Sequence, residues 1–141
     1  MQYLVDERIL KKKIIQINSS LQMITKYLDL SYDEYLSDNI AQNIVEYNLF
    51  IIINQIIDIA NHIVVDNEYG TIETMSDGFI LLNKNGFISK KDMDIYIKMV
   101  GFRNVIAHQY IDLNKAIAYD VMKNRLKDIV EFLKTVDKNF I

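Results

Sequence analysis

Proline is absent from the whole chain, and this absence is the strongest single constraint on the fold. A proline inside a helix removes a backbone hydrogen bond and clashes with the preceding turn, so a chain without proline can form long uninterrupted helices. Between Val5 and Leu28 apolar residues recur at steps of three and four, which is the period of an amphipathic helix. These residues are Leu10, Ile14, Ile17, Leu21, Ile24 and Leu28. We therefore predict a first helix over this segment and an all-α fold.

A second predicted helix runs from about Asp38 to about Val65 and is apolar on nearly all sides. A helix of this kind is expected at the centre of a bundle or at a surface that binds a partner. Before it, Ser31 with Glu34 three residues later, and then Ser37, are typical helix N-cap residues. A short helical turn is therefore expected between the two long helices.

Three polar residues of the second helix are spaced four and three apart, and they are Asn54, Asp58 and Asn61. This spacing places them on one face of an otherwise apolar helix. Buried polar groups need hydrogen-bond partners, so the stripe is either a satisfied buried network or the wall of a cleft.

The second half of the chain has a further series of helix signals. Ser76 or Asp77 can cap a short helix through Leu82, and Ser89 can cap a helix that reaches His108. Gly101 lies inside this last helix, where a glycine often permits close backbone approach. The expected core face of this helix consists of Met93, Ile97, Val100 and Ile106.

Asn114 can cap a final helix with a charged face opposite its apolar one. Its apolar positions are Ile117, Val121, Leu126, Ile129, Leu133 and Val136. Without repeats or linkers, residues 1–141 are expected to form a single domain, a four- to five-helix up-and-down bundle.

The composition excludes several classes of protein. There is no cysteine, which rules out disulfides, thiolate metal sites and cysteine nucleophiles. Charged residues from Asp6 to Arg8 do not fit a secretory signal, and the longest apolar run, Leu49 to Ile53, is too short for a membrane span. The net charge of −3 means that nucleic acid would have to bind a local basic patch. We expect a cytoplasmic protein without a metal or other cofactor.

The segment RNVIAHQY, residues 103–110, carries the side chains best suited to chemistry. It holds Arg103, His108 and Tyr110, and His108 is one of two histidines in the chain. In RNA cleavage without a metal, a base takes the proton of the ribose 2′-hydroxyl, and a cation stabilises the phosphoryl oxygens at the attacked phosphorus. His108 and Arg103 could fill these two roles.

Helix geometry argues against a simple pairing of the two residues. Five residues along a regular helix turn by about 140°, so Arg103 and His108 face different directions unless the helix ends or a second chain completes the site. Surface or helix-capping roles are the alternative for both residues, and a structural role is favoured for His62 at the end of the second helix. From composition and periodicity alone, the interpretation stops at a helical bundle.

The chain resembles the HEPN superfamily, and within it the HepT-like toxins that pair with minimal nucleotidyltransferase antitoxins. The segment RNVIAHQY matches the family motif of Arg, a polar residue, three further residues, His, any residue and Tyr. The segment NIVEYNLFIIINQIIDIANHIV resembles the long second helix of the family. The resemblance extends over about residues 1–137 as an order of helices.

This resemblance implies roles for five residues. Arg103 and His108 correspond to the ribonuclease residues, and Asn104 to the polar residue beside the arginine. Tyr110 corresponds to the tyrosine that the antitoxin adenylylates, and Asp58 to an acidic residue of the second helix that supports the site. The family also implies a homodimer whose two motifs face a shared cleft.

The expected function is therefore that of a metal-independent endoribonuclease toxin that is silenced by adenylylation of Tyr110. One alternative is a non-catalytic module that binds RNA or nucleotide, or that serves as the dimeric partner of a nucleotidyltransferase; the acidic net charge favours this class. A third possibility is an interaction bundle in which the motif only caps helices. No element that reads bases is recognisable, so the class of RNA stays open.

Overall fold

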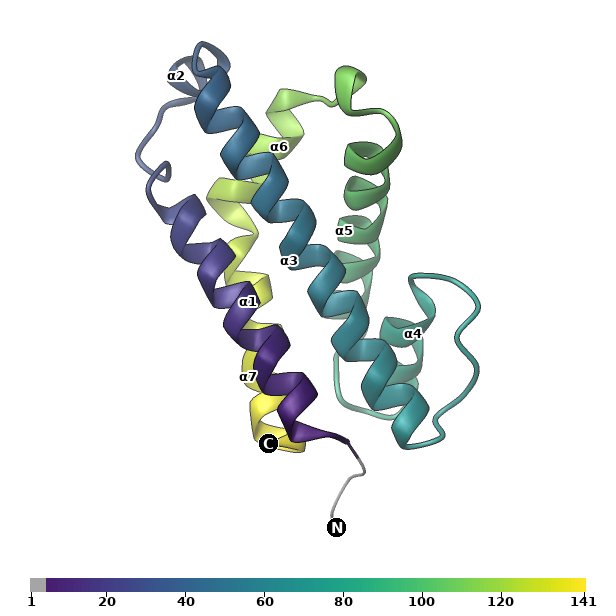
Figure 1. The fold of residues 1–141 in the computed structure, drawn as a ribbon. Helices are drawn as coiled ribbons and strands as arrows, with labels where there is room; N and C mark the ends of the chain where they lie inside the picture. The colour runs from purple at the N-terminus through teal and green to yellow at the C-terminus, as the bar shows by residue number, and fades with distance from the viewer. Residues whose placement is uncertain (1–4) are drawn as a thin grey trace.

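The computed structural model describes residues 5–141, and this part of the chain is helical without any strand (Figure 1). The long helices run up and down the molecule, as in the predicted all-α bundle. The elements in chain order are α1 (Glu7–Thr25), α2 (Tyr32–Leu36), α3 (Asn39–Asp66), α4 (Asp77–Lys84), α5 (Lys90–His108), the 3-10 helix η1 (Tyr110–Asp112), α6 (Lys115–Asn124) and α7 (Leu126–Phe140).

Helix α3 is the centre of the bundle, and α1 and α5 lie on either side of it (Figure 1). It also contacts α2, α4 and α6, which explains why its sequence is apolar on nearly all sides. Within residues 5–141, α3 is the one helix long and apolar enough to cross a membrane, but 56% of its most apolar stretch is buried inside the molecule. Burial of this kind is typical of the core helix of a soluble protein.

The helix boundaries follow the capping residues closely. Ser31 accepts a hydrogen bond from the backbone of Glu34, whose side chain accepts one from the backbone of Ser31, so the predicted capping box is present at α2. Ser89 and Asn114 cap α5 and α6 as predicted. The cap of α3 is Asp38 and not Ser37, which ends α2 by donating its hydroxyl to backbone carbonyls.

The cap of the short helix α4 also differs from the sequence prediction. Ser76 precedes this helix but makes no capping hydrogen bond through its side chain. The carboxylate of Asp77 instead accepts hydrogen bonds from the backbone of Glu73 and Thr74, in the loop before the helix. These bonds hold the loop that connects α3 to α4.

The prediction of a single final helix is wrong, because this part of the chain forms two helices, α6 and α7, that meet at Arg125. Helix α6 packs against α2 and α3, whereas α7 packs against α1. The two helices therefore bury their apolar faces against different parts of the bundle. The buried positions of α6 also lie one residue further along the chain than predicted. Ala118 and Met122 are buried, while Ile117 is half-exposed because it faces α5 and not α3.

The core face of α5 was predicted only in part. Val100 and Ile106 are buried as expected, but Met93 and Ile97 are half-buried. Most of the core contribution of this helix comes from Tyr96, Met99, Val100, Phe102 and Ile106. Apolar residues lie on several faces of α5, so spacing alone could not select the buried one.

Two glycines inside helices differ in the space available for a side chain. At Gly78 in α4, an added Cβ atom would lie 2.5 Å from Oδ1 of Asn61 and 3.1 Å from Cβ of Ala60, so glycine is what allows α4 to approach α3. At Gly101 in α5, an added Cβ atom would meet nothing within 4 Å. Within one chain, the predicted close approach at Gly101 is therefore absent.

Candidate functional site

The segment 103–110 covers the end of α5 and the turn that follows it. His108 is the last residue of α5, and Gln109 leaves the helix with φ −137° and ψ 40°. Tyr110 then begins η1, at the end of the bundle where α3 begins (Figure 1). Arg103 and His108 were expected to share a site only if the helix ends or if a second chain completes the site. Helix α5 does end at His108. No hydrogen bond joins Arg103 to His108 in the described part of the chain.

Arg103 is half-buried and held against α3. Its Nε donates to Oδ1 of Asn54 at 2.6 Å, and its Nη1 donates to Oδ1 of Asn104 at 3.1 Å. Its guanidinium also lies 4.9 Å from the ring centroid of Phe50, a cation–π contact. The guanidinium has five N–H donors, so these two hydrogen bonds leave donors that can bind a phosphate. The arrangement fixes the direction of a permanent positive charge.

The three members of the polar stripe have separate surroundings. Asn54 binds Arg103, whereas Asp58 is exposed and forms an ion pair with Lys13 of α1 at 3.3 Å. Oδ1 of Asn61 is buried without a hydrogen-bond partner. The stripe is therefore not one network, and its contact with the motif is made by Asn54. The supporting role expected for Asp58 stays a prediction.

The two histidines lie at opposite ends of the bundle. His62 is near the end of α3, while His108 is at the end of α5, which runs in the other direction (Figure 1). The imidazole of His108 belongs to an exposed residue, so a substrate can reach it. Within residues 5–141, no group of three or more His, Asp or Glu side chains is arranged to hold a metal ion.

Tyr110 is 41% exposed, and its hydroxyl donates to Oδ1 of Asn43 in α3 at 2.9 Å. The amine of Lys115 lies 5.0 Å from the centroid of its ring. Partial burial raises the pKa of the Tyr110 phenol, and the negative charge of Glu46 raises it further. The phenol is therefore neutral at physiological pH and partly accessible.

Lys115, whose amine lies beside the Tyr110 ring, pairs with a fully buried carboxylate that the sequence interpretation missed. Glu46 of α3 accepts a hydrogen bond from the hydroxyl of Tyr35 at 2.5 Å, and its Oε1 lies 2.7 Å from Nζ of Lys115. Burial, followed by the interaction with Glu46, strongly raises the pKa of Tyr35. The sequence signal was available, because Glu46 is the one charged residue between Asp38 and Asp58 in an apolar helix.

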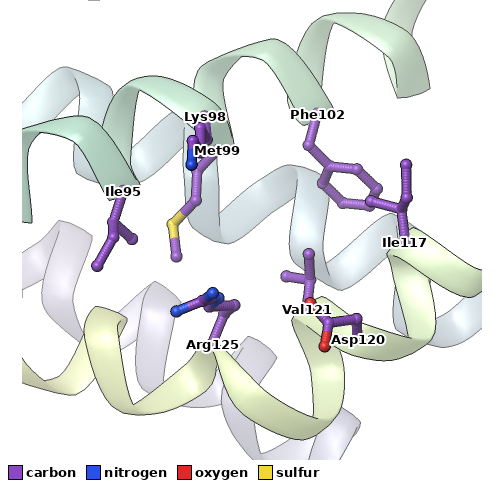
Figure 2. A pocket seen from close by; sticks show the side chains of 8 residues that line it. All are labelled: Ile95, Lys98, Met99, Phe102, Ile117, Asp120, Val121 and Arg125. Atoms are coloured by element: carbon purple, nitrogen blue, oxygen red, sulfur yellow. The ribbon is translucent and has the colours of Figure 1, made fainter.

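A separate cavity of about 210 Å³ lies between α5 and α6 (Figure 2). Its walls are mostly apolar, with three charged side chains among them. Phe102 is next to Arg103 in the chain, but its ring faces this cavity while Arg103 faces α3. The lining residues are Ile95, Lys98, Met99, Phe102, Ile117, Asp120, Val121 and Arg125. None of them is a predicted site residue.

Solved structures define the class of this fold. The chain is similar to the tri-AMPylated HEPN toxin of Shewanella oneidensis, solved in complex with an MNT antitoxin, with a TM-score of 0.85 and 31% identity. The match covers 92% of this chain and 97% of the toxin chain. The bundle, with the Arg and His motif at the end of α5, therefore has the HEPN toxin fold.

The sequence comparisons identify the family. Residues 17–136 match the ribonuclease HepT-like family, and the chain belongs to it. It is 34% identical over 103 residues to the mRNA nuclease HepT of Shewanella oneidensis, covering 73% of this chain and 77% of the relative. It is 26% identical over 132 residues to the tRNA nuclease HepT of Aphanizomenon flos-aquae, covering 89% and 90% of the two chains. The protein is an endoribonuclease of the toxin–antitoxin class.

Proposed function

We propose that Arg103 and His108 carry out the cleavage of RNA. His108 takes the proton of a ribose 2′-hydroxyl, whose oxygen attacks the adjacent phosphorus while Arg103 stabilises the charge on the phosphoryl oxygens. The bond from phosphorus to the 5′-oxygen breaks, and that oxygen takes up a proton. The products are a 2′,3′-cyclic phosphate and a 5′-hydroxyl. The observation that carries this proposal is the fixed guanidinium of Arg103 on the same helix as the exposed His108.

The separation of Arg103 and His108 supports a composite site in a homodimer, in which two copies of the motif share one cleft. The first half of α3 presents an apolar stripe to solvent, in which Ile40 and Tyr47 are 69% and 63% exposed. Gly101 of α5 has open space in front of it, which would admit the backbone of a second copy. An isologous contact through these two helices would bring both motifs together.

We further propose that a minimal nucleotidyltransferase antitoxin adenylylates Tyr110. The partly exposed phenol two residues after His108 supports this assignment, as does the AMPylated state of the related HEPN toxin in its complex with an MNT antitoxin. The modification would place a negative phosphodiester beside the groups that bind the substrate phosphate. It would therefore inhibit cleavage by occupancy and by pairing with Arg103.

Cellular RNA is the proposed substrate, in the cytoplasm, without a cofactor. The two nuclease relatives are named for mRNA and tRNA, so total cellular RNA contains both candidate classes. The competing function is a binding module that holds RNA or nucleotide without cutting it. The net charge of −3 favours this alternative, because it opposes broad attraction of RNA.

The test is cleavage of total cellular RNA by purified protein in excess EDTA, with intact mass used to show that Tyr110 is unmodified. We expect discrete products with 2′,3′-cyclic phosphate ends and no such products from His108→Ala. His108→Ala should keep the melting temperature and dimer mass of the unmodified protein. Binding of RNA without cleavage that depends on His108 would support the binding module instead.

A further inference from the structure

The side chain of Ile111 is 97% exposed, and no other large apolar side chain in residues 5–141 is as open to solvent. It is the middle residue of η1 and directly follows Tyr110. Single apolar residues on a surface are common. Most of them lie along a helix, as do Ile15 of α1 and Ile40 of α3, which are each 69% exposed. Ile111 is instead presented to solvent almost entirely.

The turn that carries Ile111 is held by contacts on both sides of this residue. On one side, the hydroxyl of Tyr110 donates to Asn43 of α3 at 2.9 Å. On the other side, the backbone of Leu113 donates to the carbonyl of Tyr110 at 3.1 Å, and the side chain of Leu113 is buried. A partner that covers Ile111 therefore does not have to order a free loop, which would weaken binding.

The chemistry of this turn fits a protein partner and not RNA. Ile111 has neither a positive charge nor an aromatic ring, which are the groups that bind phosphates and stack on bases. The next residue, Asp112, is exposed, and its negative charge repels a phosphate backbone. An apolar side chain beside a carboxylate matches a protein pocket that is apolar inside and basic at its rim.

The place of Ile111 in the chain indicates which protein covers it. A nucleotidyltransferase that modifies Tyr110 must bring ATP to the hydroxyl of this residue. Adjacent Cα atoms are about 3.8 Å apart, so an enzyme that reaches Tyr110 also approaches Ile111. The dimer contact proposed above uses the face of α3 that carries Ile40 and the open space at Gly101, and it does not require η1.

We propose that Ile111 is the residue by which the nucleotidyltransferase antitoxin recognises η1, through an apolar pocket with a basic rim next to its active site. This assignment rests on the proposed function of Tyr110 as the acceptor. Ile111 takes no part in the chemical step. Its burial contributes equally to the ground state and to the transition state, so it lowers the KM of the antitoxin for this chain and leaves kcat unchanged.

The experiment measures initial rates of AMP incorporation at Tyr110 over a range of concentrations of the purified chain, with ATP and a limiting amount of the antitoxin. Burial of a whole isoleucine side chain corresponds to about 10–100-fold in affinity, so Ile111→Ser should raise KM by about this factor at unchanged kcat. Ile111→Val keeps most of the apolar surface and should stay within about fourfold of the parental KM. Ile15→Ser is the matched control on α1 and should leave KM unchanged.

Dimer mass and RNA cleavage distinguish the antitoxin from the other possible partners of Ile111. Because this side chain is exposed, Ile111→Ser should keep the melting temperature, the dimer mass and the RNA cleavage of the unmodified parent. A lost dimer would assign Ile111 to a second copy of the chain, and lost cleavage would assign it to RNA. Either result would overturn the proposal, as would a parental KM or a loss confined to kcat.

Failure of the proposed acceptor is recognised in the parent chain itself. If the parent takes up AMP at a residue other than Tyr110, or takes up none, the role of Tyr110 fails and this inference fails with it. If the parent is modified at Tyr110 while Ile111→Ser has the parental KM, only the role of Ile111 fails.

Discussion

The contact between Asn54 and Arg103 leads to a quantitative prediction for catalysis. Asn54→Ala removes the acceptor that fixes the Arg103 guanidinium at 2.6 Å, while the contacts of Arg103 with Asn104 and Phe50 remain. The arginine therefore stays in the site but loses its fixed direction. Cleavage should become slower because fewer molecules have the charge where the phosphoryl oxygens need it.

The size of the effect follows from the hydrogen bond. A hydrogen bond to a charged group contributes about 1.5–3 kcal/mol, and solvent around these half-buried side chains reduces this to about 1–2 kcal/mol. Since about 1.4 kcal/mol corresponds to a factor of ten, Asn54→Ala should slow cleavage about 5–30-fold. Arg103→Ala removes the charge itself and should cost about 10²–10³-fold.

The assay is single-turnover cleavage of RNA at saturating protein, which isolates the chemical step from binding. Asp58→Ala is the matched control on the next turn of α3. Its exposed ion pair with Lys13 contributes little, so the structure predicts a rate within about twofold of the parent. A loss as large as that of Asn54→Ala would instead support the role that the family resemblance gives to Asp58.

A double-mutant cycle tests the reasoning directly. If Asn54 acts by orienting Arg103, adding Asn54→Ala to Arg103→Ala should cause no further loss. Two losses that simply multiply in the double variant, or an unchanged rate in Asn54→Ala itself, would refute the orienting role.

Four further predictions concern regulation and stability. Tyr110→Phe should keep RNA cleavage but take up no AMP, and continued inactivation by ATP and the antitoxin would contradict the role of Tyr110. Gly78→Ala should lower the free energy of unfolding in urea by about 1 kcal/mol or more, because the clash of its Cβ atom with Asn61 exceeds the gain in helix propensity. Gly101→Ala meets no such clash and should stabilise an isolated chain by about 0.5–1 kcal/mol, whereas a weaker dimer in analytical ultracentrifugation would place Gly101 in the interface. Burial raises the pKa of Tyr96, so the folded chain holds this proton more tightly than the unfolded chain does, and the resulting stability is present below pH 10 and is lost as the pH rises above it. In urea titrations above pH 10, Tyr96→Phe should lose less stability than the parent does.

Much of the fold could be predicted because its determinants are local. The spacing of apolar residues, the absence of proline and the caps Ser31, Ser89 and Asn114 act within one or two helical turns. The register of α6 could not be predicted in this way. Ile117 and Ala118 are adjacent and both apolar, and only the packing of α6 against α3 selects Ala118 for the core.

The sequence by itself determined the class of fold and the candidate chemistry, since the motif RNVIAHQY brings an arginine, a histidine and a tyrosine together within eight residues. The tertiary structure alone decided what holds these groups. Arg103 binds a residue 49 positions away, the Tyr110 hydroxyl one 67 positions away, and Lys115 one 69 positions away, all of them on α3. Such contacts depend on how α3 packs against α5, η1 and α6, and no local pattern encodes that packing. The buried carboxylate of Glu46 therefore acquires its partners, Tyr35 and Lys115, only in the folded bundle.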